Sequence, residues 1–589
     1  SRIRLLSTKK VMWFGNIPDI FRVMKRYCTI NCLNFPNKLM SKKNSNVAFR
    51  LSIRLLFFIV SIGLFCYPLQ AQERRGIISG GFQSDTQIYR DDDKIETVKP
   101  DEQIGSNNYL KLDYTLGEFA VGLRYEAYLP PLLGYPTSLE GRGIANRYAS
   151  YTTDLLTVTV GNFYEQFGSG LILRAYEERL LGIDNSLDGI NVRLNPLDGI
   201  RLTLLAGKQR STSFDVGDGT IRGIDGVFGI NDLLKIESNI NLQLEGSLVS
   251  KFETYTGPDP DIEEVVNAYS GRMYFNSSIF DMSAEYVEKD PDPNQNNFFD
   301  TDRRGRALLT TLSTVKKGIG FSWTFRTIDN MDFRSERNAS LTNLWVNYIP
   351  AETRQHGYLL PNIYPYAVQL NGEIGNQFNL SYFIPKKTML GGKYGTRLAL
   401  NYARFNKLDR SGISEEDARF DSNFLSFGDT TLYRDFNIEI ERRLSKKVKL
   451  VLDFVAINYN RSEIEGVPSE NVKSYIGVIE MQYKMQNRKS LRMELQHLST
   501  KQGDGNWAGL VAEYSLAPRW SFFFFDQYNY GDEEQVHYYQ VGFSYTERAS
   551  RLALNYGRQR GGLICVGGVC RNMPAASGFF LSLTTSFVK

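Results

Sequence analysis

The residues of this 589-residue chain that could do chemistry together lie in one segment where charged and apolar side chains are mixed. The segment, GNFYEQFGSGLILRAYEERLLGIDNSLDGINVRL, spans residues 161–194. Its candidate functional residues are Arg174, Tyr176, Glu177, Glu178, Arg179, Asp184 and Asp188. Opposite charges across a narrow passage set up a transverse field that selects solutes by charge and shape. We interpret the segment as an inward-folded constriction or as a packed loop whose ion pairs only stiffen the protein.

Catalysis has little support in the sequence. The three histidines, His356, His497 and His537, are scattered, and none belongs to a serine or aspartate pattern that indicates a catalytic triad. The sequence contains no GxSxG motif and no glycine-rich loop of the kind that binds phosphate. We therefore predict that the protein is not an enzyme, with no catalytic residue and no cofactor.

One acidic segment, DPDPNQNNFFDTD at residues 290–302, could offer oxygen ligands to calcium. The candidate ligands are Asp290, Asp292, Asn294, Asp300 and Asp302. The segment lacks the central glycine and the closing glutamate of an EF-hand loop. A solvated acidic loop is the simpler interpretation, so we predict no metal site.

A secretory signal peptide is predicted over residues 40–71. Basic residues precede an apolar run at residues 55–69, and Ala71 offers a small residue before the cut. The run is shorter than the roughly 20 residues of a membrane-spanning helix. We expect residues 1–39 to be an upstream translation artefact and residues 72–589 to be the mature protein.

Removing the predicted leader changes the charge and the cysteine content. The chain has 69 basic and 65 acidic residues. Residues 1–71 hold 12 of the basic residues and one of the acidic residues, so residues 72–589 carry a net charge of −7. This acidic balance predicts no nucleic-acid partner. Of the five cysteines only Cys565 and Cys570 remain. In an exported chain their spacing favours a local disulfide, with free thiols as the alternative. We expect the loop that carries the two cysteines to face the outside of the cell.

Strict alternation of apolar and polar residues dominates residues 72–589. YLKLDY at residues 109–114, LLTVTV at 155–160 and LRMELQH at 491–497 each place apolar side chains on one face of a strand. The strands come in pairs, with tight turns at residues 116–117, 517–518 and near Arg548. Long polar stretches separate these pairs, which is typical of a transmembrane antiparallel β-barrel. We predict one all-β barrel of about 22 strands, within a range of 18–26.

The last strand, GFFLSLTTSFVK, also favours a barrel over a soluble β-sandwich, propeller or β-helix. Its apolar face ends in an aromatic residue, and the residues that we expect the barrel-insertion machinery to read are Phe579, Leu581, Leu583 and Phe587. Backbone groups in hydrocarbon must be paired, so the sheet must close. We expect the last strand to pair with a first strand near residues 76–90. No fixed-period repeat occurs, and 34 Tyr and 37 Phe suit a barrel with aromatic rims.

Residues 161–194, 506–531 and 561–587 resemble a family of uncharacterised outer-membrane β-barrel proteins from Bacteroidota. The first segment is also similar to carbohydrate-type and alginate-export-type porins, in its glycine-ended strand followed by FG-G-L and IDNSLDG. The resemblance implies a multi-pass protein of the outer membrane of a Gram-negative bacterium. It implies contact with membrane lipid and with the insertion machinery, and it leaves room for other outer-membrane proteins as partners.

Two functions remain open from the sequence. A porin-like channel for small hydrophilic solutes is favoured by the mixed-charge segment and by the polar faces of the strands. A non-conducting barrel subunit of a larger assembly, secretion or surface-display complex is the alternative. A lumen filled by the protein's own loops would distinguish such a subunit from a channel.

Overall fold

A computed structural model describes residues 75–589, apart from residue 213 and residues 258–261, 296–302 and 414–421. The predicted signal peptide and the segment before it lie outside the described residues. No helix within the described part of the chain is long and apolar enough to cross a membrane.

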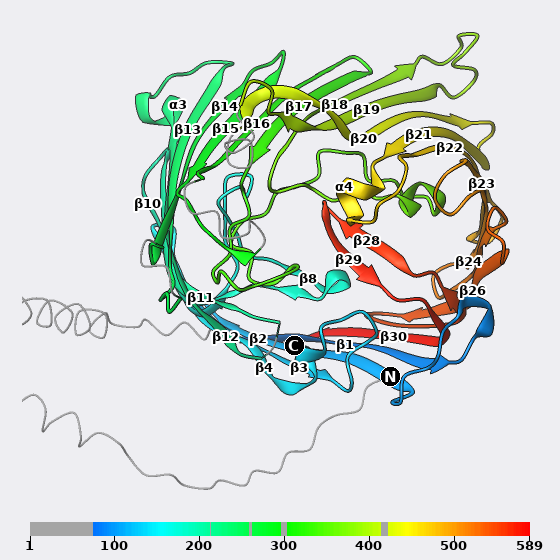
Figure 1. The fold of residues 1–589 in the computed structure, drawn as a ribbon, viewed down its shortest axis with the longest axis horizontal. Coiled ribbons are helices and arrows are strands. Elements are labelled where there is room, and N and C mark those ends of the chain that lie inside the picture. Colours follow the sequence, from blue (N-terminus) through cyan, green and yellow to red (C-terminus); the bar gives the residue numbers. More distant parts are fainter. Residues whose placement is uncertain (1–74, 213, 258–261, 296–302, 414–421) are drawn as a thin grey trace, which may run out of the picture. The chain divides into compact units, whose positions relative to one another are not determined.

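Antiparallel strands form a single 24-stranded sheet that closes on itself (Figure 1). The wall strands are β1 (Ile77–Arg90), β2 (Ile104–Leu116), β3 (Phe119–Tyr128), β4 (Gly141–Thr152), β5 (Leu156–Phe163), β10 (Leu187–Leu197), β11 (Ile200–Arg210), β12 (Val216–Gly229), β13 (Asn241–Phe252), β14 (Val265–Asn276), β15 (Asp281–Lys289), β16 (Gly305–Lys316), β17 (Ile319–Asp329), β18 (Glu373–Ile384), β19 (Thr396–Asp409), β20 (Asn423–Arg443), β21 (Val448–Tyr459), β22 (Val472–Lys484), β23 (Lys489–Ser499), β24 (Trp507–Leu516), β25 (Trp520–Asn529), β26 (Val536–Glu547), β27 (Ser550–Gln559) and β30 (Ala576–Val588). The predicted fold class is confirmed, and the strand count lies close to the expected 22.

The remaining described elements are short and lie in the connections. They are η1 (Asp93–Ile95), η2 (Thr137–Leu139), β6 (Gln166–Phe167), β7 (Leu173–Arg174), β8 (Glu177–Glu178), η3 (Arg179–Leu181), β9 (Ile183–Asp184), α3 (Ile230–Leu234), η5 (Leu360–Ile363), α4 (Arg461–Glu465), β28 (Gly562–Val566) and β29 (Val569–Met573).

The first and last wall strands close the barrel, as the sequence predicted. β30 pairs with β1 through a register that places Phe82 opposite Thr585, and it pairs with β27 on its other side. The predicted turns fall between β2 and β3, between β24 and β25, and between β26 and β27. Because each wall strand has two hydrogen-bonded neighbours, the barrel has no open sheet edge.

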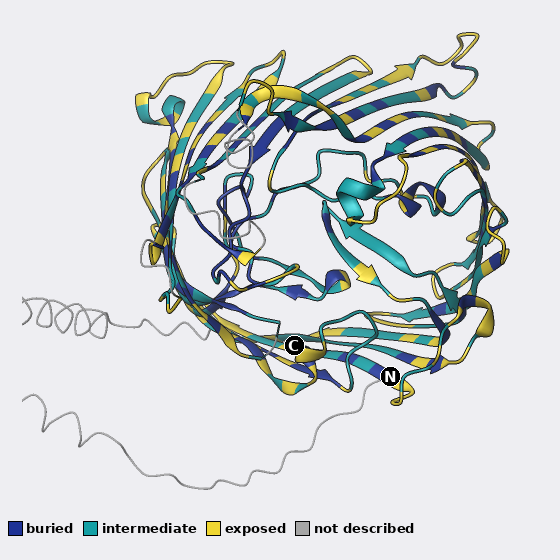
Figure 2. Cartoon of the chain, viewed as in Figure 1, coloured by how far each residue is buried: buried dark blue, intermediate teal, exposed yellow. Residues whose placement is uncertain are grey.

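Burial alternates from residue to residue along many wall strands, as expected when successive side chains point to opposite faces (Figure 2). On β1, Gln83 accepts a hydrogen bond from Arg179 of an interior loop, so the odd-numbered residues of this strand face inward. On β30, Ser582 donates to the inward Asp85, whereas the neighbouring Leu581 is exposed. On these two strands, large apolar side chains are therefore exposed on the outer face, and the interior face is mostly polar.

Three connections pack inside the barrel, and the β21–β22 connection with α4 also lies within its outline (Figure 1). The three connections are residues 164–186 between β5 and β10, residues 330–372 between β17 and β18, and residues 560–575, which carry the β28–β29 hairpin. We call them together the luminal plug. The tip of this hairpin bonds to the 330–372 loop. That the cysteine loop faces the outside of the cell stays a prediction.

Two apolar cores seat the plug on the inner wall. In the first core, Leu171 and Phe333 of the plug pack with wall residues such as Val249. In the second, Leu360 and Tyr366 pack with the walls of β19–β24. Burying these side chains against apolar wall positions removes them from water, which holds the loops inside.

Candidate luminal site

Backbone hydrogen bonds join the three parts of the plug to one another. The Tyr348 amide donates to the Gly170 carbonyl at 2.9 Å, which links the 330–372 loop to the 164–186 loop. The Ala351 amide donates to the Gly567 carbonyl at 3.0 Å, and the Tyr348 hydroxyl donates to the same carbonyl at 2.8 Å. The tip of the β28–β29 hairpin therefore lies against the 330–372 loop.

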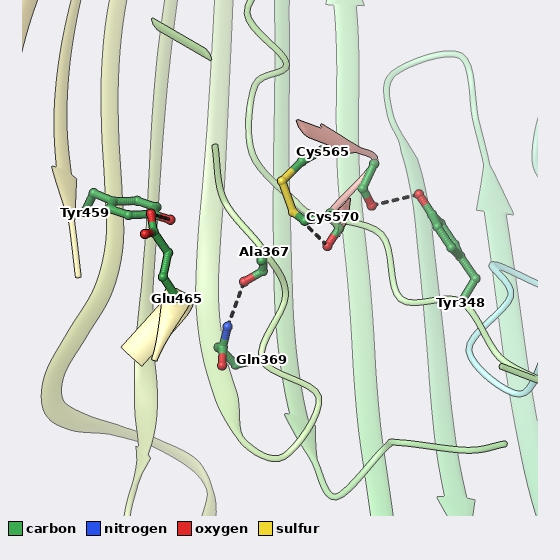
Figure 3. The surroundings of a disulfide bond; sticks show 9 residues. Tyr348, Ala367, Gln369, Tyr459, Glu465, Cys565 and Cys570 are labelled. Atoms are coloured by element: carbon green, nitrogen blue, oxygen red, sulfur yellow. Dashed lines mark hydrogen bonds between the residues drawn. A yellow bond between two sulfur atoms is a disulfide. The ribbon is translucent and has the colours of Figure 1, made fainter. Parts of the chain in front are cut away.

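A disulfide between Cys565 and Cys570 lies just behind this tip (Figure 3). The turn residues Gly567 and Gly568 have φ angles of +56° and +88°, in the left-handed region that glycine adopts without strain. A Cβ atom on Gly568 would lie 2.7 Å from the Ala351 nitrogen, so the close approach of the two backbones requires glycine there.

Removing this disulfide is expected to loosen the plug. The Cys565→Ser, Cys570→Ser double variant should lose about 2 kcal/mol of unfolding free energy, the chain-entropy estimate for a loop this short. Urea titration of the detergent-folded barrel, followed by tryptophan fluorescence, measures the loss. Non-reducing mass spectrometry of the parent protein should find neither cysteine open to alkylation. Two alkylated thiols would contradict the pairing.

The predicted constriction residues meet two wall arginines in a buried charge cluster. The Arg124 guanidinium of β3 contacts Asp184, lies 2.9 Å from Glu177 Oε2 and lies 2.6 Å from Glu126 Oε1 of its own strand. Arg210 of β11 lies 2.7 Å from both Glu126 and Asp184. Burial raises the pKa of the Asp184 carboxyl, but the two guanidinium groups outweigh it and hold the pKa below its ordinary value.

The other predicted constriction residues are held by separate contacts. Arg174 lies over the rings of Tyr348 and Tyr176, at 3.9 and 4.8 Å from their centres. Arg179 lies over the Tyr109 ring, and Glu178 accepts from the Leu180 amide. Asp188 lies apart on β10, where it pairs with the exposed Arg147 at 3.3 Å. Apart from Asp188, these residues therefore pack and pair within the plug and its wall.

The predicted calcium candidates do not converge in the described part of the chain. Asp292 is buried and pairs with the equally buried Lys251 at 2.5 Å. Asp290 accepts from Asn267, and Asn294 donates to the Asp292 carbonyl. Asp300 and Asp302 lie outside the described residues. No group of described acidic, histidine or cysteine residues is arranged to hold a metal ion.

A cavity of about 400 Å³ lies between the 330–372 loop, the β28–β29 hairpin and strands β25–β27. Its polar lining is rich in carboxamide and tyrosine side chains, which are Gln355, Asn362, Tyr366, Tyr433, Gln527, Tyr538, Gln540 and Gln559. Its basic lining comprises Arg354, His356, Arg558 and Arg560. None of the described residues that line the cavity is an aspartate or a glutamate.

Three of these four basic side chains have a nearby carboxylate. Arg354 contacts Glu439, His356 lies 2.7 Å from Asp435, and Arg558 lies 2.6 Å from Asp92. Within the described chain, the Arg560 guanidinium has neither an ion pair nor a side-chain hydrogen bond. Burial lowers the pKa of Arg560, and the more distant carboxylate of Asp504 offsets this only in part.

Sequence reasoning missed this cavity because its residues come from distant segments. Alternation on β25 and β26 does place Gln527, Tyr538 and Gln540 on one face, opposite the exposed Val541. That pattern could have marked an inward polar surface. Nothing local indicates that Arg560 stands beside it, because the position of Arg560 depends on the folding back of the hairpin.

Comparison with known proteins gives a family and a likeness of fold. A family described as "Family of unknown function (DUF6029)" matches residues 49–587. No curated protein matches the chain. The P pilus usher (PapC) translocation pore is 10% identical over 87% of this chain and 99% of its own, with a TM-score of 0.42. The siderophore receptor PirA from Pseudomonas aeruginosa is 11% identical over 87% and 80%, with a TM-score of 0.38. The outer membrane protein opdK from Pseudomonas aeruginosa is 10% identical over 87% and 99%, with a TM-score of 0.33.

Proposed function

The chain belongs to the DUF6029 family, whose function is unknown, and from its geometry we propose that it is a porin-like channel in the outer membrane of a Gram-negative bacterium. It passes small hydrophilic solutes through a lumen that the luminal plug narrows. The observation that carries this proposal is the polar cavity inside a closed barrel. The proposal involves no catalysis and no cofactor.

The outer surface supports a position in a lipid bilayer. Apolar side chains such as Leu204, Ile224 and Leu581 are exposed at alternate positions of their strands, and the closed sheet pairs its backbone groups internally. Both properties are what a hydrocarbon environment requires of a barrel. Membrane lipid and the barrel-insertion machinery are then its partners, with the Phe579, Leu581, Leu583 and Phe587 face of β30 as the insertion signal.

A charge on this outer face is expected to destabilise the inserted barrel. Leu581→Arg should cost about 2–4 kcal/mol if the residue lies near the bilayer midplane, because a guanidinium must enter hydrocarbon. The matched control is Thr584→Arg on the same strand, which faces the interior opposite Gln83. Urea unfolding in lipid vesicles measures both variants. Equal stabilities of the two variants would contradict the lipid-facing assignment.

Solute passage is tested by swelling of proteoliposomes that contain the folded barrel. Vesicles in isosmotic solutions of neutral sugars should swell, and the rate should fall as the sugar grows larger than the gaps beside the plug. Protein-free vesicles control for leakage through the bilayer. Swelling no faster than in those controls, with insertion verified, would contradict the channel.

A second function is favoured by the two apolar cores that hold the plug on the wall. A lumen closed in this way suits a non-conducting barrel subunit of an assembly, secretion or surface-display complex. Barrels that remain closed in vesicles but crosslink to another outer-membrane protein in native membranes would favour this second function.

A further inference from the structure

We propose that the cavity beside the β28–β29 hairpin binds a small polyhydroxylated carboxylate, such as an acidic monosaccharide, with Arg560 as the anion ligand. This inference rests on the proposed role of the lumen as a path for solutes, and it names the class of solute. It is carried by the charge of the cavity lining, by the types of its polar groups and by its volume.

The charge of the lining favours an anion. Arg560 follows the last residue of β27 at the base of the hairpin and lines the cavity without an ion pair among the described residues. A half-buried guanidinium has lost part of its interaction with water. A charge-assisted hydrogen bond to a carboxylate compensates for that loss. The planar fork of arginine also fits the two oxygens of a carboxylate.

The charge count favours a monoanion over a dianion such as phosphate. Arg354 and Arg558 also line the cavity, but Glu439 and Asp92 already compensate them. Arg560 is therefore the one arginine of the described lining whose charge has no ion-pair partner. A doubly charged group would leave one negative charge unpaired in a partly desolvated site, which is costly.

The rest of the lining favours a hydroxylated body attached to the carboxylate. Gln527 and Gln540 are carboxamides, which both donate and accept hydrogen bonds, as a hydroxyl requires of its partners. Gln540 already accepts from Asn555 at 2.7 Å, so its own amide hydrogens are the ones available to a ligand. The Tyr538 ring supplies an apolar face. A volume of about 400 Å³ lies within the usual range for small-molecule sites.

Isothermal titration calorimetry on the full mature barrel in detergent tests this assignment, with D-glucuronate as the probe. D-Glucose, which has the same ring without the carboxylate, and inorganic phosphate are the comparison ligands. We expect D-glucuronate to bind more tightly than either. Arg560→Gln should weaken D-glucuronate binding about tenfold or more, the effect of losing a charge-assisted pair, and should leave D-glucose unaffected.

Two further variants keep the result interpretable. Arg551→Gln removes the same charge from an exposed position of β27 that does not line the cavity, and it should bind like the parent protein. Arg560→Lys keeps the charge but loses the fork, so its affinity should lie between those of the parent and Arg560→Gln. Heat-modified migration on gels shows whether each variant is folded.

The outcomes separate this inference from the channel proposal, because binding in detergent does not require conduction. Parent protein that does not bind D-glucuronate, or binds it no better than D-glucose, would overturn the inference even if vesicles swell. Equal affinities of the parent and a folded Arg560→Gln or Arg560→Lys variant would overturn it as well. Binding that depends on Arg560 in a barrel that does not conduct would support the site and overturn only the channel.

Discussion

Replacing Arg124 with methionine should lower the free energy of unfolding by about 3–5 kcal/mol, the usual cost of removing one partner from a buried ion pair. Arg124 is buried and contacts Glu126, Glu177 and Asp184. Methionine fills part of the space but offers no charge. Arg210 then remains to compensate Glu126 and Asp184, and Glu177 keeps only its contact with Arg179.

The matched control for this variant is Arg147→Met. Arg147 pairs with Asp188 at 3.3 Å, but its side chain is 64% exposed. Exposed pairs are worth at most about 1 kcal/mol, so the control should barely change stability. Urea titration of both variants in detergent, followed by tryptophan fluorescence, gives the two values. Equal small losses would show that the cluster does not hold the 164–186 loop on the wall.

Deleting the β28–β29 hairpin should raise the single-channel conductance severalfold, which is the largest functional change that we expect. The variant replaces residues 562–573 by a short glycine–serine link. The hairpin lies within the lumen and bonds to the 330–372 loop, so its loss widens the passage and releases that loop. A barrel with this many strands encloses a wide lumen unless its loops fill it.

The Cys565→Ser, Cys570→Ser double variant shows whether the conductance depends on the volume of the hairpin or on its rigidity. It keeps the hairpin and loses only the bond between its strands. We expect its mean conductance to stay near that of the parent protein, with larger fluctuations. A folded deletion variant with unchanged conductance would show that solutes do not pass beside the hairpin.

Local sequence patterns were sufficient for the wall of the barrel. Alternation sets which face of each strand is apolar, and tight turns such as Gly117 between β2 and β3 fix the pairing of neighbours. Closure follows from the same local rules, since β30 has one apolar face and must pair with β1 when no other partner remains. The faces of the strands and the hairpin pairings depend on neighbours in the chain, and closure adds only the requirement that the first and last strands find a partner, so one sequence can reveal them.

The interior depended on contacts between distant segments and could not be predicted in the same way. The charges of residues 174–188 were visible, but the partners Arg124 and Arg210 lie on β3 and β11. The glycine-rich cysteine loop has the composition of an exposed turn. Its glycines instead allow the close approach to Ala351, which only the folded chain brings near. The cavity around Arg560 arises from that same approach.

Single-channel recording of the purified wild-type barrel in a planar bilayer tests the central claim most directly. A solute channel narrowed by its own loops predicts discrete conductance steps that scale with salt concentration, and an ion selectivity that changes in Arg560→Gln. A verified, inserted barrel that gives no steps would contradict the channel. The luminal plug would then be the seal of a non-conducting subunit.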